Sequence, residues 1–196
     1  MTRGTAKGAA NLFEAAGLAD TAPRPLADRL RPQILDEVIG QDHLLGGGLL
    51  GRMVGAGRLT SVIFWGPPGT GKTTVARLLA EVTDLHFEQL SAIQSGVADL
   101  RKVFDAAKAK REAGRGTLLF IDEIHRFNRS QQDAFLPHME DGTIVLVGAT
   151  TENPSFELNS ALLSRASVLT FKRLDDAEQT LEQLEAFDPD KESYNQ

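Results

Sequence analysis

Short apolar segments alternate along the chain with longer segments in which apolar residues recur at helical spacing. Brief apolar runs rich in β-branched and aromatic residues are typical of strands that are buried on both faces of a sheet. The predicted strands are residues 61–65, 86–90, 117–121, 143–149 and 168–171.

The segments between these runs predict helices, and glycines mark where two of them end. Val75, Leu78 and Leu79 share one side of a helix, while Gly114 and Gly142 follow two later helices. Strands that alternate with helices in this way predict an α/β fold, a parallel sheet with helices on both faces. The predicted helices are residues 41–56, which glycines 46–48 weaken, 73–82, 97–113, 130–140 with Ser130 as the cap, 159–164 and 175–186.

The composition is that of a globular protein and removes several classes of chemistry. The 196 residues are 41% hydrophobic and 24% charged, and none is cysteine. Disulfides, thiolate nucleophiles and cysteine zinc sites are therefore excluded. No apolar run approaches the roughly 20 residues of a membrane helix, and no apolar segment follows Arg3 and Lys7 as in a secretory signal. These features predict a cytoplasmic protein with no membrane partner.

Negative charge is concentrated at the end of the chain. The net charge is −6; residues 172–196, with 3 basic and 8 acidic side chains, contribute −5, so residues 1–171 sum to −1. A nearly neutral body gives no global attraction for nucleic acid, so any DNA contact needs a local patch or an assembled ring. At the other end, residues 1–25 are rich in alanine, glycine and threonine and are predicted to be a flexible leader.

Residues 66–73 match the phosphate-binding loop pattern in full, after a predicted strand and before a predicted helix. Glycines let backbone N–H groups converge on phosphate oxygens, and the helix N-terminus adds partial positive charge. Lys72 is expected to reach the β- and γ-phosphates of ATP, and Thr73 to ligate Mg²⁺. The predicted nucleotide ligands of this loop are Gly66, Pro67, Pro68, Gly69, Thr70, Gly71, Lys72, Thr73 and Thr74.

Two carboxylates, Asp122 and Glu123, follow the apolar strand at residues 117–121. Because parallel strands present their carboxyl ends to the ligand edge of the sheet, these acids are expected near the loop. Asp122 is predicted to hold Mg²⁺, and Glu123 to activate the attacking water. With Ile124 and His125 they also spell the D-E-x-H motif of a helicase class. We interpret His125 as an ordinary loop histidine, with coupling of hydrolysis to DNA as the alternative.

Three further segments narrow the family. They are Arg31-Pro32 with residues 35–41, residues 122–128 and residues 148–154. With Trp65 and the phosphate loop, they resemble AAA+ ATPases of the bacterial replication-associated recombination protein A family, which are clamp-loader-like, over residues 25–174. The resemblance implies a P-loop NTPase (AAA+) fold, with ATP and Mg²⁺ as ligands. It also implies DNA-dependent ATP hydrolysis at stalled forks or recombination intermediates.

The same resemblance implies further site residues. Thr151 matches the sensor that contacts the γ-phosphate, with Thr150 as the alternative one place earlier. Arg165 matches the arginine finger, which acts on ATP bound by a neighbouring subunit. The implied adenine pocket is formed by Arg31, Pro32, Ile39, Gly40 and Gln41.

Contacts with macromolecules are also implied by the resemblance. Residues 91–99, followed by Arg101 and Lys102, match the segment that faces the centre of the ring in the family. Two interpretations of these residues stay open: a contact with single-stranded or fork-like DNA, and a helix face that is only solvated. Residues 11–13, Asn-Leu-Phe, are a hypothetical docking motif for the sliding clamp, or Phe13 folds back and is buried. Single-strand-binding protein is a further candidate partner. The resemblance also implies that the protein is located in the cytoplasm, in association with the nucleoid.

The resemblance divides the chain into a leader (1–25), an AAA+ nucleotide-binding core (26–172) and the start of a lid or a non-native acidic tail (173–196). Family members continue into a helical lid and an oligomerisation region. The chain is therefore expected to be truncated, with the lid largely absent, and to be monomeric and weakly active although the family forms homo-oligomers. Two alternatives stay open: a Holliday-junction branch-migration motor core, and a truncated nucleotide-binding module with little hydrolysis.

Overall fold

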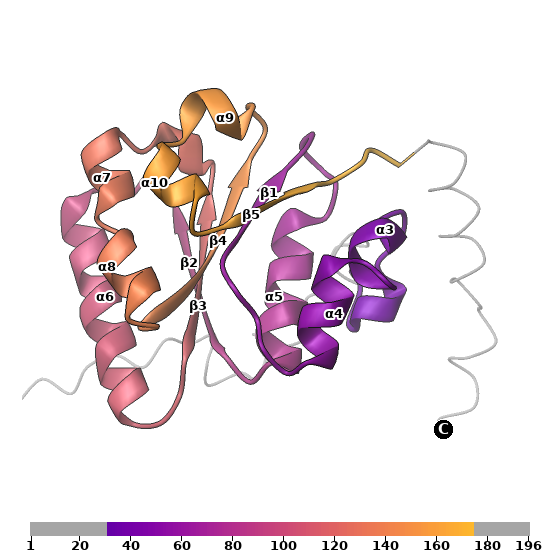
Figure 1. The fold of residues 1–196 in the computed structure, drawn as a ribbon, viewed down its shortest axis with the longest axis horizontal. Helices are drawn as coiled ribbons and strands as arrows, with labels where there is room; N and C mark the ends of the chain where they lie inside the picture. The colour runs from indigo at the N-terminus through magenta and orange to yellow at the C-terminus, as the bar shows by residue number, and fades with distance from the viewer. Residues whose placement is uncertain (1–30, 175–196) are drawn as a thin grey trace, which may run out of the picture. The chain divides into compact units, whose positions relative to one another are not determined.

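The computed structural model describes residues 31–174, of which residues 32–174 belong to one compact unit. This unit contains a five-stranded sheet in the order β2-β3-β4-β1-β5, with every neighbouring pair parallel (Figure 1). The predicted α/β fold is confirmed. The strands are β1 (Val62–Trp65), β2 (His86–Ser91), β3 (Thr117–Asp122), β4 (Ile144–Thr150) and β5 (Ser167–Thr170).

Two hydrophobic cores cover the two faces of the sheet, because successive side chains of a strand point to opposite faces. Leu118 and Phe120 of β3 belong to one core, and Leu119 and Ile121 to the other. This double burial explains why the strand is apolar at every position. The first core includes residues of α3 (Asp42–Leu45), α4 (Leu49–Gly55) and α5 (Lys72–Val82), and the second includes residues of α6 (Val97–Glu112) and α10 (Ser160–Leu163). Leu136 and Met139 of α8 (Leu136–Glu140) pack against the second core, and α7 (Arg129–Asp133) lies on the same side of the sheet (Figure 1).

Two predicted helices are each divided in the structure. The helix predicted at residues 41–56 is broken between α3 and α4, where Gly48 is extended at φ −71° and ψ −177°. A Cβ at Gly51 would lie 1.7 Å from the Leu45 carbonyl oxygen, so glycine allows α4 to fold back closely on α3.

The helix predicted at residues 130–140 is interrupted between α7 and α8, and Pro137 lies in the first turn of α8. Asn128, not Ser130, caps α7: its side chain accepts a hydrogen bond from Gln131 N at 2.9 Å. Three short elements were not predicted: α9 (Pro154–Glu157) and the 3₁₀ turns η2 (Leu35–Glu37) and η3 (Ile124–Arg126). The predicted leader and the predicted helix at residues 175–186 lie outside the described residues.

Candidate nucleotide site

The phosphate loop and the acid pair lie on either side of the end of β4. The register pairs Trp65 of β1 with Thr150 of β4, and Ile121 of β3 with Gly148. The first residue of the loop is joined to the same strand, because Gly66 N donates to the Thr150 carbonyl oxygen at 3.1 Å. Three segments that are far apart in the sequence thus meet at the carboxyl edge of the sheet.

The loop conformation depends on its glycines. Gly71 caps the N-terminus of α5 with φ +85°, and Gly69 has φ +75°, a left-handed region that favours glycine. Gly66 is required for a different reason: a Cβ there would lie 2.4 Å from the Phe171 carbonyl oxygen at the end of β5. The turn between β1 and α5 is therefore shaped by backbone constraints that match the sequence motif.

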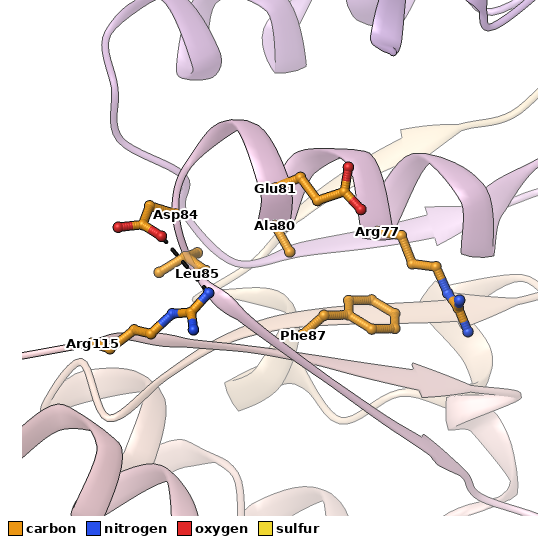
Figure 2. A pocket seen from close by; sticks show the side chains of 7 residues that line it. All are labelled: Arg77, Ala80, Glu81, Asp84, Leu85, Phe87 and Arg115. Carbon is orange, nitrogen blue, oxygen red and sulfur yellow. Dashed lines mark ion pairs between the residues drawn. The ribbon is translucent and has the colours of Figure 1, made fainter. Parts of the chain in front are cut away.

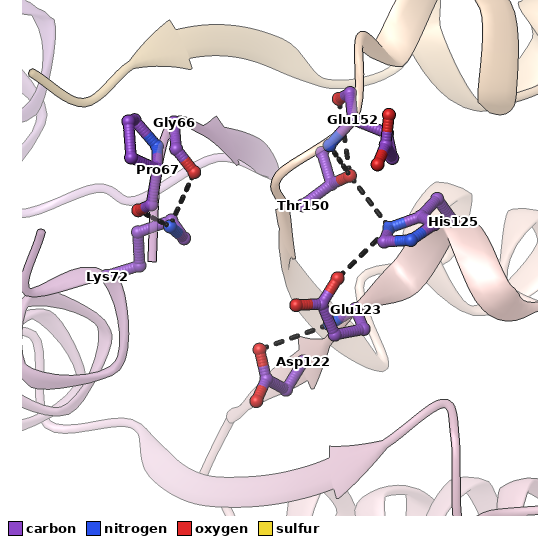
Figure 3. Close-up of polar contacts among 8 residues, drawn as sticks. All are labelled: Gly66, Pro67, Lys72, Asp122, Glu123, His125, Thr150 and Glu152. Carbon is purple, nitrogen blue, oxygen red and sulfur yellow. Dashed lines mark hydrogen bonds and ion pairs between the residues drawn. The ribbon is translucent and has the colours of Figure 1, made fainter. Parts of the chain in front are cut away.

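The Lys72 ammonium lies inside this loop (Figure 3). Its Nζ donates to the carbonyl oxygens of Gly66 at 2.8 Å and Pro67 at 2.6 Å. Burial lowers the pKa of Lys72 from its ordinary value, while the negative charges of Glu123 and Asp122 act in the opposite direction. Both carboxylates thus act on the Lys72 ammonium electrostatically, although no direct ion pair joins Lys72 to either of them in residues 31–174.

The two acids differ in their backbone and in their contacts. Asp122 is the last residue of β3, and its Oδ1 accepts from Glu123 N at 3.1 Å. Glu123 adopts φ +53° and ψ 45°, a left-handed conformation that is uncommon for a residue other than glycine. Such strain is concentrated at functional sites. The Glu123 side chain lies toward His125, which is two residues further along the chain (Figure 3).

His125 is the site residue that the sequence interpretation missed. Only 7% of its side chain is exposed, and its Nδ1 lies 3.3 Å from Glu123 Oε2. The same nitrogen is 2.9 Å from Thr150 Oγ1, so the ring bridges the ends of β3 and β4 (Figure 3). The interpretation as an ordinary loop histidine does not describe these contacts. The D-E-x-H spacing was the available signal and left a functional role open as the alternative, but spacing alone does not predict where the ring points.

Of the two adjacent sensor candidates, the structure brings Thr150 into this network. Thr150 is the last residue of β4 and is 1% exposed, and its hydroxyl also accepts from Glu152 N at 3.0 Å. Thr151 follows the strand and is half-buried. Which hydroxyl contacts the γ-phosphate stays a prediction, but Thr150 is the one held beside Glu123 through His125.

The residues predicted to line the adenine pocket include one with a clear structural task. Gln41 is 1% exposed, its Nε2 donates to the Lys172 carbonyl oxygen at 2.8 Å, and its Oε1 accepts from Lys172 N at 3.2 Å. Gly40, at φ +72°, faces Leu174, whose Cδ2 would lie 1.7 Å from a Cβ. This segment is therefore attached to the chain that leaves β5. Pro32 and Ile39 are half-buried near it in sequence, and contact of the five residues, Arg31 included, with adenine stays a prediction.

Arg165 lies at the opposite edge of the sheet. It follows α10, close to the start of β5, where Ser167 N donates to the Ser61 carbonyl oxygen just before β1. Its Nε and Nη2 are both 2.6 Å from Glu140 Oε1, and its Nη1 donates to the Ala161 carbonyl oxygen at 2.9 Å. The phosphate loop and Arg165 lie at opposite ends of parallel strands. Arg165 is therefore too far from the phosphate loop to contact a nucleotide bound by its own chain.

Two other surfaces lie outside the site. A hollow of about 320 Å³ separates the second half of α5 from β2, with Arg77 over the Phe87 ring at 5.3 Å from its centroid (Figure 2). None of the predicted site residues lines it. Residues 91–99, which lead into α6, expose Ile93 and Val97, which are 68% and 54% accessible, and Arg101 on α6 is exposed as well. A DNA contact of that segment stays a prediction.

In residues 31–174 no helix is both long and apolar enough to cross a membrane. The same residues contain no cluster of three or more histidine or acidic side chains with metal-binding geometry.

Comparison with known proteins places this geometry in a family. The AAA family pattern, "ATPase family associated with various cellular activities", matches residues 62–174. The chain is 57% identical over 168 residues to replication-associated recombination protein A of Escherichia coli K12, covering 84% of this chain and 38% of that protein. It is 48% identical over 151 residues to ATPase WRNIP1 of Dictyostelium discoideum, covering 76% of this chain and 17% of that one.

A solved structure shows the same fold. The RuvB Holliday junction branch migration motor of Thermotoga maritima superposes with a TM-score of 0.64 at 32% identity, covering 78% of this chain and 52% of that one. This chain therefore spans well under half the length of the curated relatives it matches. The family pattern covers more than half of the chain. On this basis the protein belongs to the AAA family of ATPases, as the linked motifs of its sequence predict.

Proposed function

We propose that residues 32–174 form the ATP-hydrolysing core of a protein that maintains DNA replication and recombination, converting ATP to ADP and phosphate. One observation carries the proposal: the Lys72 ammonium and the Asp122–Glu123 pair lie on either side of the end of β4, at one edge of the sheet. Phosphoryl transfer to water needs positioning and charge neutralisation more than covalent chemistry. A cation in a backbone loop opposite two carboxylates supports both requirements.

The residues at this edge fit ATP and Mg²⁺. Gly69 and Gly71 have open space where a Cβ would be, so their backbone is accessible to phosphate oxygens. Thr73 and Asp122 are half-buried and offer oxygen ligands, which Mg²⁺ prefers. Mg²⁺ in nucleotide sites is held by one or two protein oxygens plus the phosphates, so two protein ligands suffice. When bound, the ion neutralises negative charge on the phosphates.

Each residue then has one role. Lys72 leaves its loop carbonyls to donate to the phosphates, and Glu123 accepts a proton from the attacking water. Thr151, or Thr150 one place earlier, orients the terminal phosphate from the end of β4. Arg165 supplies positive charge to the site of a neighbouring copy, which agrees with its place at the opposite edge of the sheet.

The biological setting is proposed from the relatives. The 57% identity to replication-associated recombination protein A favours a DNA-stimulated ATPase at stalled forks or recombination intermediates, working in the cytoplasm at the nucleoid. A Holliday-junction branch-migration core is the second candidate, because the RuvB structure superposes over 78% of this chain. The lower identity to that motor, 32%, favours the first. Homo-oligomerisation also stays a proposal. The sliding clamp and single-strand-binding protein are the proposed protein partners.

Phosphate release is the direct test. The chain is assayed with ATP in the presence of Mg²⁺, then with EDTA in its place, with and without single-stranded DNA, over a range of protein concentrations. The proposal expects Mg²⁺-dependent release that the Glu123→Gln variant lacks. Equal release by the parent chain and by Glu123→Gln would show that another protein in the sample is responsible and would overturn the assignment.

A further inference from the structure

His125 lies between two groups of the proposed hydrolytic site. Its Nδ1 is 2.9 Å from Thr150 Oγ1 and 3.3 Å from Glu123 Oε2. The left-handed turn at Glu123 leads directly into η3, which carries the ring back toward β4. With only 7% of its side chain exposed, His125 is held in one place by the surrounding protein. The two polar groups on Nδ1 belong to different strands, so the ring couples the end of β3 to the end of β4.

The neighbouring groups determine which ring nitrogen carries the proton. A carboxylate only accepts hydrogen bonds, so an unprotonated Nδ1 would turn its lone pair toward the charge of Glu123. The Thr150 hydroxyl donates to the Glu152 carbonyl oxygen at 3.3 Å and accepts from Glu152 N at 3.0 Å. Its second lone pair is then available to Nδ1–H. With Nδ1 as the donor, its one N–H is directed to the Thr150 hydroxyl, and the Glu123 carboxylate 3.3 Å away faces a proton and not a lone pair.

We infer that His125 is a positioning residue for Glu123: its Nδ1–H, hydrogen-bonded to Thr150, attracts the carboxylate at 3.3 Å and makes the orientation of Glu123 depend on the end of β4. The inference rests on the proposed ATPase function, in which Glu123 accepts the proton from water. Thr150 is hydrogen-bonded to the backbone of Glu152, so it moves with the segment that contains Thr151. A displacement of that segment by the terminal phosphate is transmitted to Glu123 through one imidazole.

The protonated nitrogen can be measured without any turnover. The chain is labelled with ¹⁵N-histidine and its ring nitrogens are observed by NMR near neutral pH; the His125 signals are those missing in His125→Asn. The inference expects the Nδ1–H form, and a shift of these signals in Glu123→Gln. An Nε2–H form, or signals that do not respond to Glu123→Gln, would overturn it.

Kinetics separate positioning from packing. In His125→Asn an amide N–H lies near the former Nδ1, whereas in His125→Gln it lies nearer the former Nε2. We expect His125→Gln to lower kcat at least ~10-fold with little change in the KM for ATP, and His125→Asn to recover most of that loss. Parallel losses of nucleotide affinity and melting temperature, or equal kcat losses in both variants, would mean that His125 only packs.

The two arms also separate this inference from the proposed function. If the parent chain shows no turnover while His125 is in the Nδ1–H form and responds to Glu123→Gln, the ATPase proposal fails and the contact between His125 and Glu123 stands. If turnover depends on Glu123 while His125 is in the Nε2–H form, the ATPase proposal stands and the positioning role is overturned.

Discussion

At the carboxyl edge of the sheet the charged side chains are partly buried and connected, whereas at the amino edge the principal cation is exposed. Lys72 is bonded to loop carbonyls and influenced by two carboxylates, and Glu123 contacts a nearly buried His125. Arg165, at the other edge, pairs with Glu140, and their side chains are 38% and 53% exposed. Electrostatic effects are stronger where water is excluded. The comparison suggests that one edge is arranged for chemistry within the chain and the other for action on a neighbour.

The largest effect is expected from the buried edge. Lys72→Ala removes the one cation inside the phosphate loop among the described residues, and with it several kcal/mol of phosphate stabilisation. Nucleotide binding and turnover should both be lost, which calorimetry and phosphate release would measure. Lys72→Arg is the control, because it keeps the positive charge but replaces the ammonium with a larger, planar guanidinium. ATP affinity that survives Lys72→Ala unchanged would contradict the assignment of this edge.

The exposed edge is tested next by Arg165→Ala. Loss of an arginine finger typically lowers turnover about 10³–10⁵-fold, provided that the parent chain assembles and that its turnover per chain rises with concentration. Mixing Arg165→Ala with Lys72→Ala tests action between chains, since one variant keeps an intact site and the other an intact finger. Turnover that is recovered in the mixture would support action of Arg165 on the nucleotide site of a neighbouring chain. A mixture that is inactive at every ratio would show that Arg165 does not act on a partner's site.

Glu123→Gln is expected to have a smaller effect, confined to the chemical step. The amide preserves the shape of the side chain but cannot accept a proton, and general bases contribute about 10²–10⁴-fold in rate. Nucleotide affinity should stay within a few-fold of the parent chain, in contrast to Lys72→Ala. A binding defect in a folded Glu123→Gln protein would show that this carboxylate has a structural task instead.

A change in stability is predicted for Gln41→Ala. The substitution removes both side-chain hydrogen bonds to the backbone of Lys172, which are partly buried. A loss of about 1–3 kcal/mol in the free energy of unfolding is expected and is measurable by urea denaturation. Unchanged stability with weaker ATP binding would favour the adenine contact over the structural one.

The smallest effect is predicted for Glu140→Gln. The ion pair with Arg165 is exposed at both ends, and such pairs contribute less than about 1 kcal/mol. The unfolding free energies of the parent and the variant should converge further as salt is raised. A loss of several kcal/mol in the free energy of unfolding that persists in high salt would mean that the ion pair at the amino edge is as tightly held as the contacts at the carboxyl edge. The two edges would then not differ as described.

Local patterns predicted much of the fold and the main charged groups of the site. The residues 66–73 motif places a turn and a helix N-terminus directly after a strand, and the apolar run before Asp122 ends at the same edge of any parallel sheet. Helix interruptions were harder to predict. Asn128 and Ser130 are both good caps, and only the hydrogen bond to Gln131 N distinguishes them. Similarly, glycines 46–48 weakened a predicted helix, but the fold-back of α4 on α3, which Gly51 allows, decided that it breaks.

Contiguous residues and their periodicity are enough to predict the alternation of buried strands and helices, the phosphate loop and the acid pair. Features that depend on strand order and side-chain direction are visible only in the folded chain. The register of β1, β3 and β4 brings Gly66, Thr150 and Glu123 together. Two adjacent threonines look alike in a sequence, but only Thr150 ends the strand with its hydroxyl on His125. That contact joins residues 25 positions apart, which no local pattern can encode.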